Sequence, residues 1–217
     1  MKDFRQKITF VYAYENEKWS TPMALANEFK RIGWEVEFVS IGSNGTGKYH
    51  DRDLQLWIQQ DTPSNIVLFM DWGRFDSRWL DKTLKPNTYW IQESGDDPQN
   101  FERNYPKSER FNLTLSPDFE SSKEYRKRNQ DSAWWTHFAD TAVQYPMDIK
   151  EEYVAVTTRG RGNSQFLDTL TAHGNGTIGN QAGFNAPQHT EFLNKGLMVI
   201  QNSRWGEVTR RIFEGMA

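Results

Sequence analysis

One continuous apolar run constrains the fold of this chain more than any other feature. The run spans residues 65–71 (NIVLFMD) and has no polar residue between its two ends. A strand with this pattern is typical of a parallel sheet covered on both faces, because a strand with one wet face alternates polar and apolar residues. The sequence therefore predicts an α/β fold built around a parallel sheet.

Further strand-like and helix-like segments alternate along the chain. Strands are predicted at residues 7–14, 35–41, 88–93, 111–116, 153–158 and 197–203. One helix is expected to open at Thr21 and Pro22 and to end at Gly33, and another is expected to begin at residues 116–118. Shorter helices are expected after Asp51 and over residues 78–84, 166–174 and 187–196. This succession predicts parallel strands joined by right-handed crossovers.

The length of 217 residues exceeds one typical domain and falls short of two full doubly wound ones. The alternation pauses over residues 134–152, where Pro146 and a run of charged residues indicate a linker. We therefore expect a Rossmann-like N-terminal domain over residues 1–145 and a partial second Rossmann-like domain over residues 146–217. No strand pattern follows the helix predicted to end at Ala217, which indicates truncation within the second domain.

Composition narrows the classes of function. A net charge of −3 argues against a general nucleic-acid surface, and the basic run at residues 123–128 is interpreted as the solvated face of a short helix. The absence of cysteine excludes disulfides, thiolate metal sites and cysteine nucleophiles. No signal peptide and no apolar run of roughly 18 residues is visible, so we expect a cytoplasmic protein without a membrane span.

Two short motifs allow alternative interpretations. The segment from Gly42 to Lys48 (GSNGTGK) fits the phosphate loop G-x-x-x-x-G-K, but the next residue is Tyr49, where Mg²⁺ binding requires Ser or Thr. It is either such a loop, with Asp71 as its metal-side partner, or a flexible glycine loop. The segment 51–53 (DRD) is either an Asp-x-Asp metal motif or a helix start capped by Asp51.

Three residues are candidates for proton transfer. Asp96 and Asp97 follow the strand at residues 88–93, at the sheet edge where open α/β folds bind ligands. Either carboxylate is a candidate general base toward a sugar hydroxyl, or the pair forms a plain turn with a capping aspartate. His137 lies in a loop segment and is either catalytic or structural. A further pair, Arg159 and Arg161, leaves the strand at residues 153–158 and either clamps phosphate oxygens or lies on the surface.

Several segments together resemble one family. The segment from Trp134 to Asp140 (WWTHFAD), the strand and turn leading to Arg161, and the run from Arg211 to Glu214 (RIFE) resemble the spore-maturation CgeB-like group of glycosyltransferases, which have the GT-B fold. The chain departs from the family at residues 156–158 (VTT), where the family has Phe-Val-Gly. Family members need strands and helices beyond the position of Ala217 for the donor site.

The resemblance implies transfer of a sugar from a nucleotide-activated donor to an acceptor hydroxyl. In that interpretation Arg159 and Arg161 neutralise the diphosphate, whereas Arg211 and Glu214 belong to the helix that binds the donor. The acceptor side would hold Asp96, Asp97 or His137. No cofactor or bound metal is expected, because cationic side chains and a helix dipole stabilise the departing diphosphate.

Two other functions remain open from the sequence. One is a phosphate-loop nucleotide hydrolase that uses Lys48 and Asp71 with Mg²⁺. The other is a binding module that recognises a nucleotide or another ligand without turnover. A fold alone does not separate an enzyme from a binding module.

Overall fold

The computed structural model describes residues 6–12, 21–40, 57, 59, 64–71, 82–83, 85–95, 97–158, 169, 172, 178–181 and 186–200. The chain divides into two compact units, Met1–Thr136 and His137–Ala217. The predicted division lay at residues 145 and 146. No helix in the described part of the chain is both long and apolar enough to cross a membrane.

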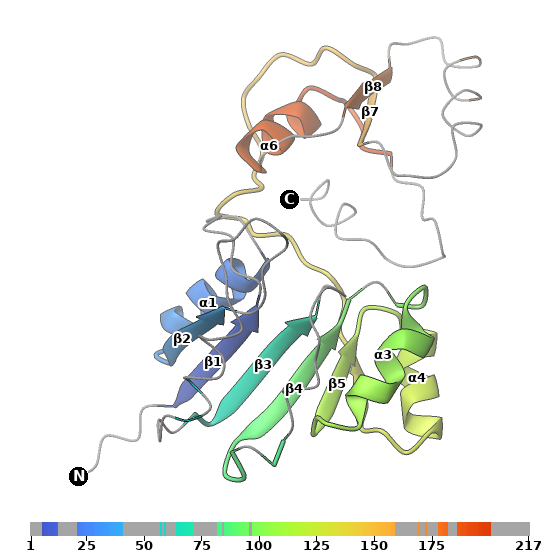
Figure 1. The fold of residues 1–217 in the computed structure, drawn as a ribbon. Coiled ribbons are helices and arrows are strands. Elements are labelled where there is room, and N and C mark those ends of the chain that lie inside the picture. Colours follow the sequence, from blue (N-terminus) through green and yellow to red (C-terminus); the bar gives the residue numbers. More distant parts are fainter. Residues whose placement is uncertain are drawn as a thin grey trace. The chain divides into compact units, whose positions relative to one another are not determined.

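The first unit contains a six-stranded sheet in which every pair of neighbouring strands is parallel (Figure 1). Its strands are β1 (Lys7–Tyr12), β2 (Glu35–Ser40), β3 (Ile66–Asp71), β4 (Tyr89–Ser94), β5 (Leu113–Ser116) and β6 (Ser132–Trp134), in the order β2-β1-β3-β4-β5-β6. The order reverses between β1 and β3, as in doubly wound sheets. The predicted Rossmann-like α/β class is confirmed.

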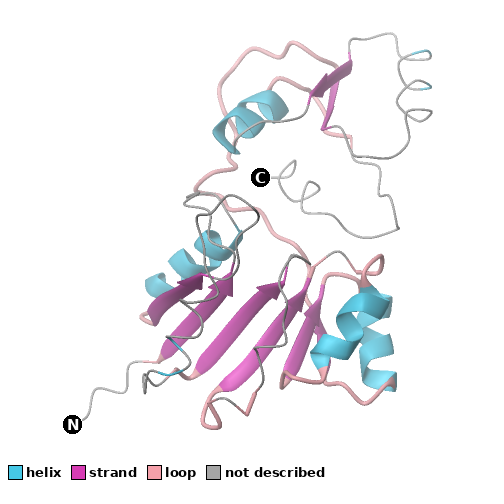
Figure 2. Ribbon diagram, in the orientation of Figure 1, coloured by secondary structure: helices cyan, strands magenta, loops and turns pink. Residues whose placement is uncertain are grey.

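Helices lie on both faces of this sheet (Figure 2). Helix α1 (Thr21–Arg31) packs on β1 and β2, α3 (Phe101–Ser108) on β4, and α4 (Phe119–Lys127) on β5 and β6. Phe29 of α1 meets Phe10 on one face, with ring centroids 6.0 Å apart. The Tyr125 hydroxyl of α4 reaches Ser94 on the opposite face.

The central strand β3 explains the apolar run that dominates the sequence. Val67 and Phe69 point to one face, where they join a buried cluster with Val11, Val39, Trp57, Trp90 and Phe111. Leu68 and Met70 point to the other face and join Ile8, Phe10, Ala26 and Leu115. Both faces of β3 are therefore dry, which is why apolar residues occupy consecutive positions.

The C-terminus of α1 confirms the predicted glycine stop. Gly33 has φ of 91°, a conformation that glycine adopts without strain. The Gly33 N–H donates to the Lys30 carbonyl at 3.0 Å, and the Trp34 N–H donates to the Phe29 carbonyl at 2.9 Å. These two bonds form the Schellman pattern. The rings of Trp34 and Phe29 also pack edge to face at 5.3 Å. This contact fixes the turn into β2.

The second unit contains a parallel pair of strands and one described helix. These are β7 (Ala155–Thr158), β8 (Ile178–Gln181) and α6 (Ala186–Asn194), packed around Val156, Phe192 and Leu193. The predicted strand at residues 197–203 is described as far as Ile200, and Val199 forms a bridge with Val156.

Hydrogen bonds attach the predicted linker to this second unit. The Thr190 hydroxyl donates to the Val143 carbonyl at 2.9 Å, and the Met147 N–H donates to Asn194 Oδ1 at 2.7 Å. Thr190 and Asn194, the two side chains that form these bonds, belong to α6. Residues 143–147 therefore belong with α6, which accounts for a division earlier in the chain than the sequence predicted.

Candidate functional site

A buried aspartate marks the carboxyl edge of the sheet between β4 and β5. Asp97 lies in the loop that joins β4 to α3, and its side chain is only 2% exposed. Its Oδ2 accepts a hydrogen bond from the Ser116 hydroxyl at 2.9 Å, and its Oδ1 accepts one from Asn104 Nδ2 at 3.4 Å. The carboxyl group therefore ties its loop to the end of β5 and to α3.

Further hydrogen bonds extend this contact into a network. The hydroxyl oxygen of Ser94, at the end of β4, accepts a hydrogen bond from Asn104 Nδ2 at 2.8 Å. The same oxygen lies 3.0 Å from the Tyr125 hydroxyl oxygen. Asn104 Nδ2 also lies 3.2 Å from the Gly95 carbonyl. We call Ser94, Asp97, Asn104, Ser116 and Tyr125 the Asp97 cluster. Its members come from β4, β5, α3, α4 and the loop between β4 and α3, and all five are buried.

Burial changes the proton affinity of the two acidic groups in this cluster. Burial removes water from the Asp97 carboxyl group and raises its pKa to about 6. Hydrogen bonds from Ser94, Ser116, Asn104 and Tyr125 lower the pKa and offset part of this rise. Burial also raises the pKa of Tyr125, and the nearby Asp97 charge adds to that rise. A carboxyl group with a pKa near 6 exchanges a proton close to neutral pH, as a general base or acid requires.

Other polar atoms on the same sheet face are buried without a hydrogen-bond partner. Within the described residues they are both amide atoms of Gln92, the indole Nε1 of Trp90, the Thr114 hydroxyl and Asn104 Oδ1. Gln92 and Thr114 lie opposite each other in the register of β4 and β5. Gln92, a glutamine at a central position of a strand-like segment, is the signal in the sequence for this polar stripe, and we did not predict the stripe from it.

Only some of the predicted site residues lie in the described part of the chain. Asp97 is described, and His137 is half-buried at the start of the second unit, outside regular secondary structure. Asp96 and the four donor-side residues, Arg159, Arg161, Arg211 and Glu214, lie outside the described residues. Of the predicted set, only Asp97 therefore has a defined environment at the sheet edge.

The phosphate-loop candidate lies outside the described residues as well, from Gly42 to Tyr49. The strand that precedes it, β2, is the edge strand of the sheet. Asp71 ends β3, and the alternative metal motif at residues 51–53 is not described. The nucleotide-hydrolase alternative therefore stays a prediction.

The described residues contain no group of three or more histidine, aspartate or glutamate side chains arranged to hold a metal ion.

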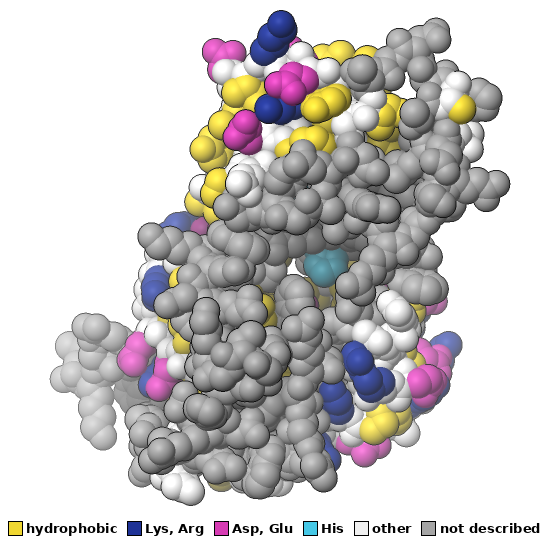
Figure 3. All heavy atoms as spheres, turned by 45° about the horizontal axis from the view of Figure 1, so that its top comes forward, with side chains coloured by type: hydrophobic (Ala, Val, Ile, Leu, Met, Phe, Trp, Pro, Cys, Tyr) yellow, Lys and Arg dark blue, Asp and Glu magenta, His cyan; other side chains and the backbone are white. Residues whose placement is uncertain are grey.

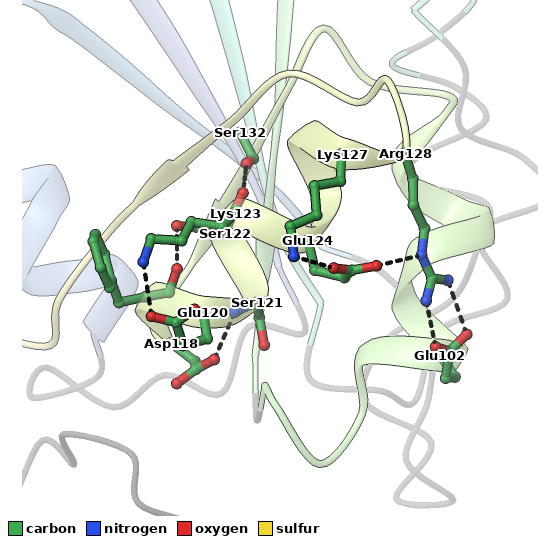
Figure 4. A network of polar contacts seen from close by, with 11 residues as sticks. Glu102, Asp118, Glu120, Ser121, Ser122, Lys123, Glu124, Lys127, Arg128 and Ser132 are labelled. Atoms are coloured by element: carbon green, nitrogen blue, oxygen red, sulfur yellow. Dashed lines mark hydrogen bonds and ion pairs between the residues drawn. The ribbon is translucent and has the colours of Figure 1, made fainter.

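An ion-pair network covers the helices beside the Asp97 cluster (Figure 4). Arg128, after α4, donates through Nη1 and Nη2 to both carboxylate oxygens of Glu102 on α3, at 3.1 and 2.8 Å. Its Nε donates to Glu124 at 3.1 Å. The guanidinium also lies 4.9 Å from the ring centroid of Phe101 and 5.0 Å from that of Tyr105. Acidic and basic side chains gather over α3 and α4 on the surface (Figure 3).

Arg128→Met should therefore lower the midpoint of thermal unfolding, because it removes the forked contact between α3 and α4. The loss should shrink in high salt, which screens exposed charges. Lys127→Met is the matched control, since Lys127 is more exposed and, among the described residues, forms an ion pair with Glu124 alone, at 3.1 Å. An equal loss for both variants, measured by circular dichroism at low and high salt, would contradict a special role for the Arg128 fork.

No protein-family model matches this chain, and no curated protein matches it either.

Proposed function

We propose that the chain is a glycosyltransferase that moves a sugar from a nucleotide-activated donor to an acceptor hydroxyl. The observation that carries the proposal is the Asp97 carboxyl group, whose pKa is raised to about 6 at the carboxyl edge of a parallel Rossmann-like sheet. Open α/β sheets bind ligands outside the carboxyl ends of their strands, the end of the sheet at which Asp97 lies. The resemblance to CgeB-like glycosyltransferases supports the same reaction.

The proposal assigns the acceptor side to Asp97, with Asp96 and His137 as alternative bases. The base removes the proton of the acceptor hydroxyl, and the acceptor oxygen forms a bond to the anomeric carbon of the donor. The bond between that carbon and the diphosphate oxygen breaks, and the diphosphate leaves with the electron pair. Because Asp97 is 2% exposed, an acceptor reaches it only after the Asp97 side chain separates from Ser116 of β5. Its bonds to Ser116 and Asn104 are the contacts that this movement breaks.

The donor side is assigned to Arg159, Arg161, Arg211 and Glu214. The two arginines of the turn neutralise the diphosphate, and Glu214 binds hydroxyl groups of the donor. No metal ion or other cofactor is required in this proposal, because guanidinium groups and a helix N-terminus stabilise the charge that develops on the diphosphate.

A binding module without turnover is the second candidate, and the burial of Asp97 is the observation that favours it. The Asp97 side chain is 2% exposed and accepts a hydrogen bond on each carboxylate oxygen. It can therefore hold its loop against β5 and α3 without any movement of the loop. The two candidates differ in one respect: the module binds a nucleotide sugar and leaves it intact.

Calorimetric titration of the 217-residue chain with UDP-glucose, GDP-mannose, ADP-glucose and TDP-glucose tests both candidates. We expect binding heat with one donor, and Arg161→Ala should weaken that binding about tenfold or more, since a charge-assisted hydrogen bond contributes about 1.5–3 kcal/mol. Arg126→Ala is the control, because Arg126 is exposed on α4 in the first unit. This variant should bind the donor with the affinity of the native chain.

The absence of heat with every donor, in a sample whose circular dichroism shows folded protein, would reject the proposal. Binding of a donor that stays intact in the presence of a panel of sugar and alcohol acceptors would favour the binding module. Equal affinity for the native chain and both arginine variants would remove Arg161 from the donor site.

A further inference from the structure

Two exposed aromatic side chains lie against each other at the carboxyl edge of the sheet. Phe119 begins α4, directly after β5, and Trp134 ends β6. They are 47% and 49% exposed, and their rings meet edge to face with centroids 5.6 Å apart. We call these two residues the aromatic pair. Single exposed apolar residues are ordinary, but two in contact at the ligand-binding edge of an α/β sheet need an explanation.

The aromatic pair is held in a fixed position. The Trp134 indole Nε1 donates a hydrogen bond to the Pro117 carbonyl at 3.2 Å, so its polar atom is already used within the chain. The Lys123 ammonium lies 4.0 Å from the centroid of the Phe119 ring and is bonded to Glu120 at 2.8 Å. Rings fixed in this way lose little conformational entropy when a ligand stacks on them.

The charges around the pair indicate a neutral ligand. Asp118 and Glu120 outnumber Lys123, and the ammonium of Lys123 is already paired with Glu120. The N-terminus of α4 would otherwise attract an anion, but Asp118 caps it by accepting the Ser121 N–H at 2.7 Å. A phosphorylated or carboxylated ligand therefore meets a carboxylate at this position.

A carbohydrate fits both properties. A sugar ring presents C–H groups on one face, which pack on an aromatic ring, and hydroxyl groups at its rim, which bond to carboxylate and ammonium groups such as those of Glu120 and Lys123. We propose that the aromatic pair binds a neutral carbohydrate and that this carbohydrate is the acceptor. The assignment as acceptor rests on the proposed function, whereas carbohydrate binding itself does not.

Saturation-transfer NMR with the 217-residue chain and no donor tests this site. The probes are maltotriose, cellotriose and chitotriose, each titrated into the millimolar range. We expect one of them to bind, with its C–H protons receiving saturation. Trp134→Ala should raise its dissociation constant about threefold to tenfold, the equivalent of about 0.5–1.5 kcal/mol for a stacked ring.

Two further variants separate stacking from a general loss of structure. Phe119→Leu keeps apolar volume at the start of α4 but removes the ring, so it should also weaken binding. Tyr89→Ala is the control, because Tyr89 is 46% exposed at the first position of β4, at the opposite edge of the same sheet. Tyr89→Ala should leave the dissociation constant unchanged.

Three results would overturn the proposal. The first is no transfer to any of the three oligosaccharides. The second is the same dissociation constant for the native chain, Trp134→Ala and Phe119→Leu. The third is a Trp134-dependent signal from UMP or AMP and none from the sugars, which would make the pair a nucleobase platform. Because no donor is present, each result is independent of the outcome of donor calorimetry.

Discussion

Replacing Trp90 by alanine is expected to lower the free energy of unfolding by about 3–5 kcal/mol, the usual cost of truncating a large core aromatic residue. Trp90 is fully buried in β4, and its ring centroid lies 6.1 Å from that of Trp57 and 6.5 Å from that of Phe111. Alanine leaves a cavity between these rings that the rigid sheet fills only partly. Urea denaturation followed by circular dichroism measures the loss.

The neighbouring Tyr89 gives the matched control for this variant. Tyr89 is 46% exposed, since consecutive side chains of a strand point to opposite faces and the first position of β4 lies at the rim. Tyr89→Ala should therefore change the free energy of unfolding by less than about 1 kcal/mol. Similar losses for the two variants would mean that Trp90 does not lie in the core.

The parts of the fold that the sequence predicted depend on local patterns. The run at residues 65–71 predicted a doubly buried strand because every position of β3 between its ends is apolar, and both core clusters draw on it. Gly33 predicted the end of α1 because the left-handed conformation at that position favours glycine. In both cases the physical cause lies within a few residues of the signal.

The elements that the sequence analysis missed have weak local signals. Helix α3 spans eight residues, includes Pro106 and is preceded by Pro98, a combination that indicates a turn. Strand β6 spans three residues, and its last residue, Trp134, is the first of the stretch interpreted as a linker. Packing against β4 and β5 stabilises these short elements, and such contacts between distant residues are not visible in a local pattern.

In the candidate site, too, a local pattern predicted one feature, while contacts between distant residues determine the rest. The position of Asp97 after a strand placed it at the sheet edge, and the structure puts it there. Its partners Asn104, Ser116 and Tyr125 lie 7, 19 and 28 residues along the chain, and nothing in their local sequence links them to Asp97. The raised pKa follows from burial by these partners, so it could not be predicted before the fold was known.

Asp97 is expected to make the protein less stable as the pH rises from about 4 to above 6. Burial raises the pKa of this carboxyl group from 3.8 to about 6 in the folded state. Between these values the folded protein keeps a proton that the unfolded chain has lost, so unfolding releases a proton and rising pH favours the unfolded state. The penalty is absent below pH 3.8 and complete above pH 6.

At about 1.4 kcal/mol per unit, this shift corresponds to about 3 kcal/mol of stability. The native chain alone does not isolate the effect, because other carboxyl groups titrate in the same range. Arg128 lowers the pKa of Glu102, and Lys127 and Arg128 lower that of Glu124, so these two groups act in the opposite direction. A comparison with Asp97→Asn removes their contribution, since both proteins contain them.

Asparagine at position 97 keeps the shape of the side chain and never carries a charge. Its carbonyl oxygen accepts from Asn104, while its amide donates to Ser116, whose hydroxyl hydrogen turns to the Asp118 carbonyl 3.1 Å away. We therefore expect the native chain to lose about 3 kcal/mol relative to Asp97→Asn between pH 3.5 and pH 7.5, measured by urea denaturation at each pH. A difference that stays constant over this range would mean that water reaches the carboxylate, and that Asp97 ionises in the folded protein as it does in the unfolded chain.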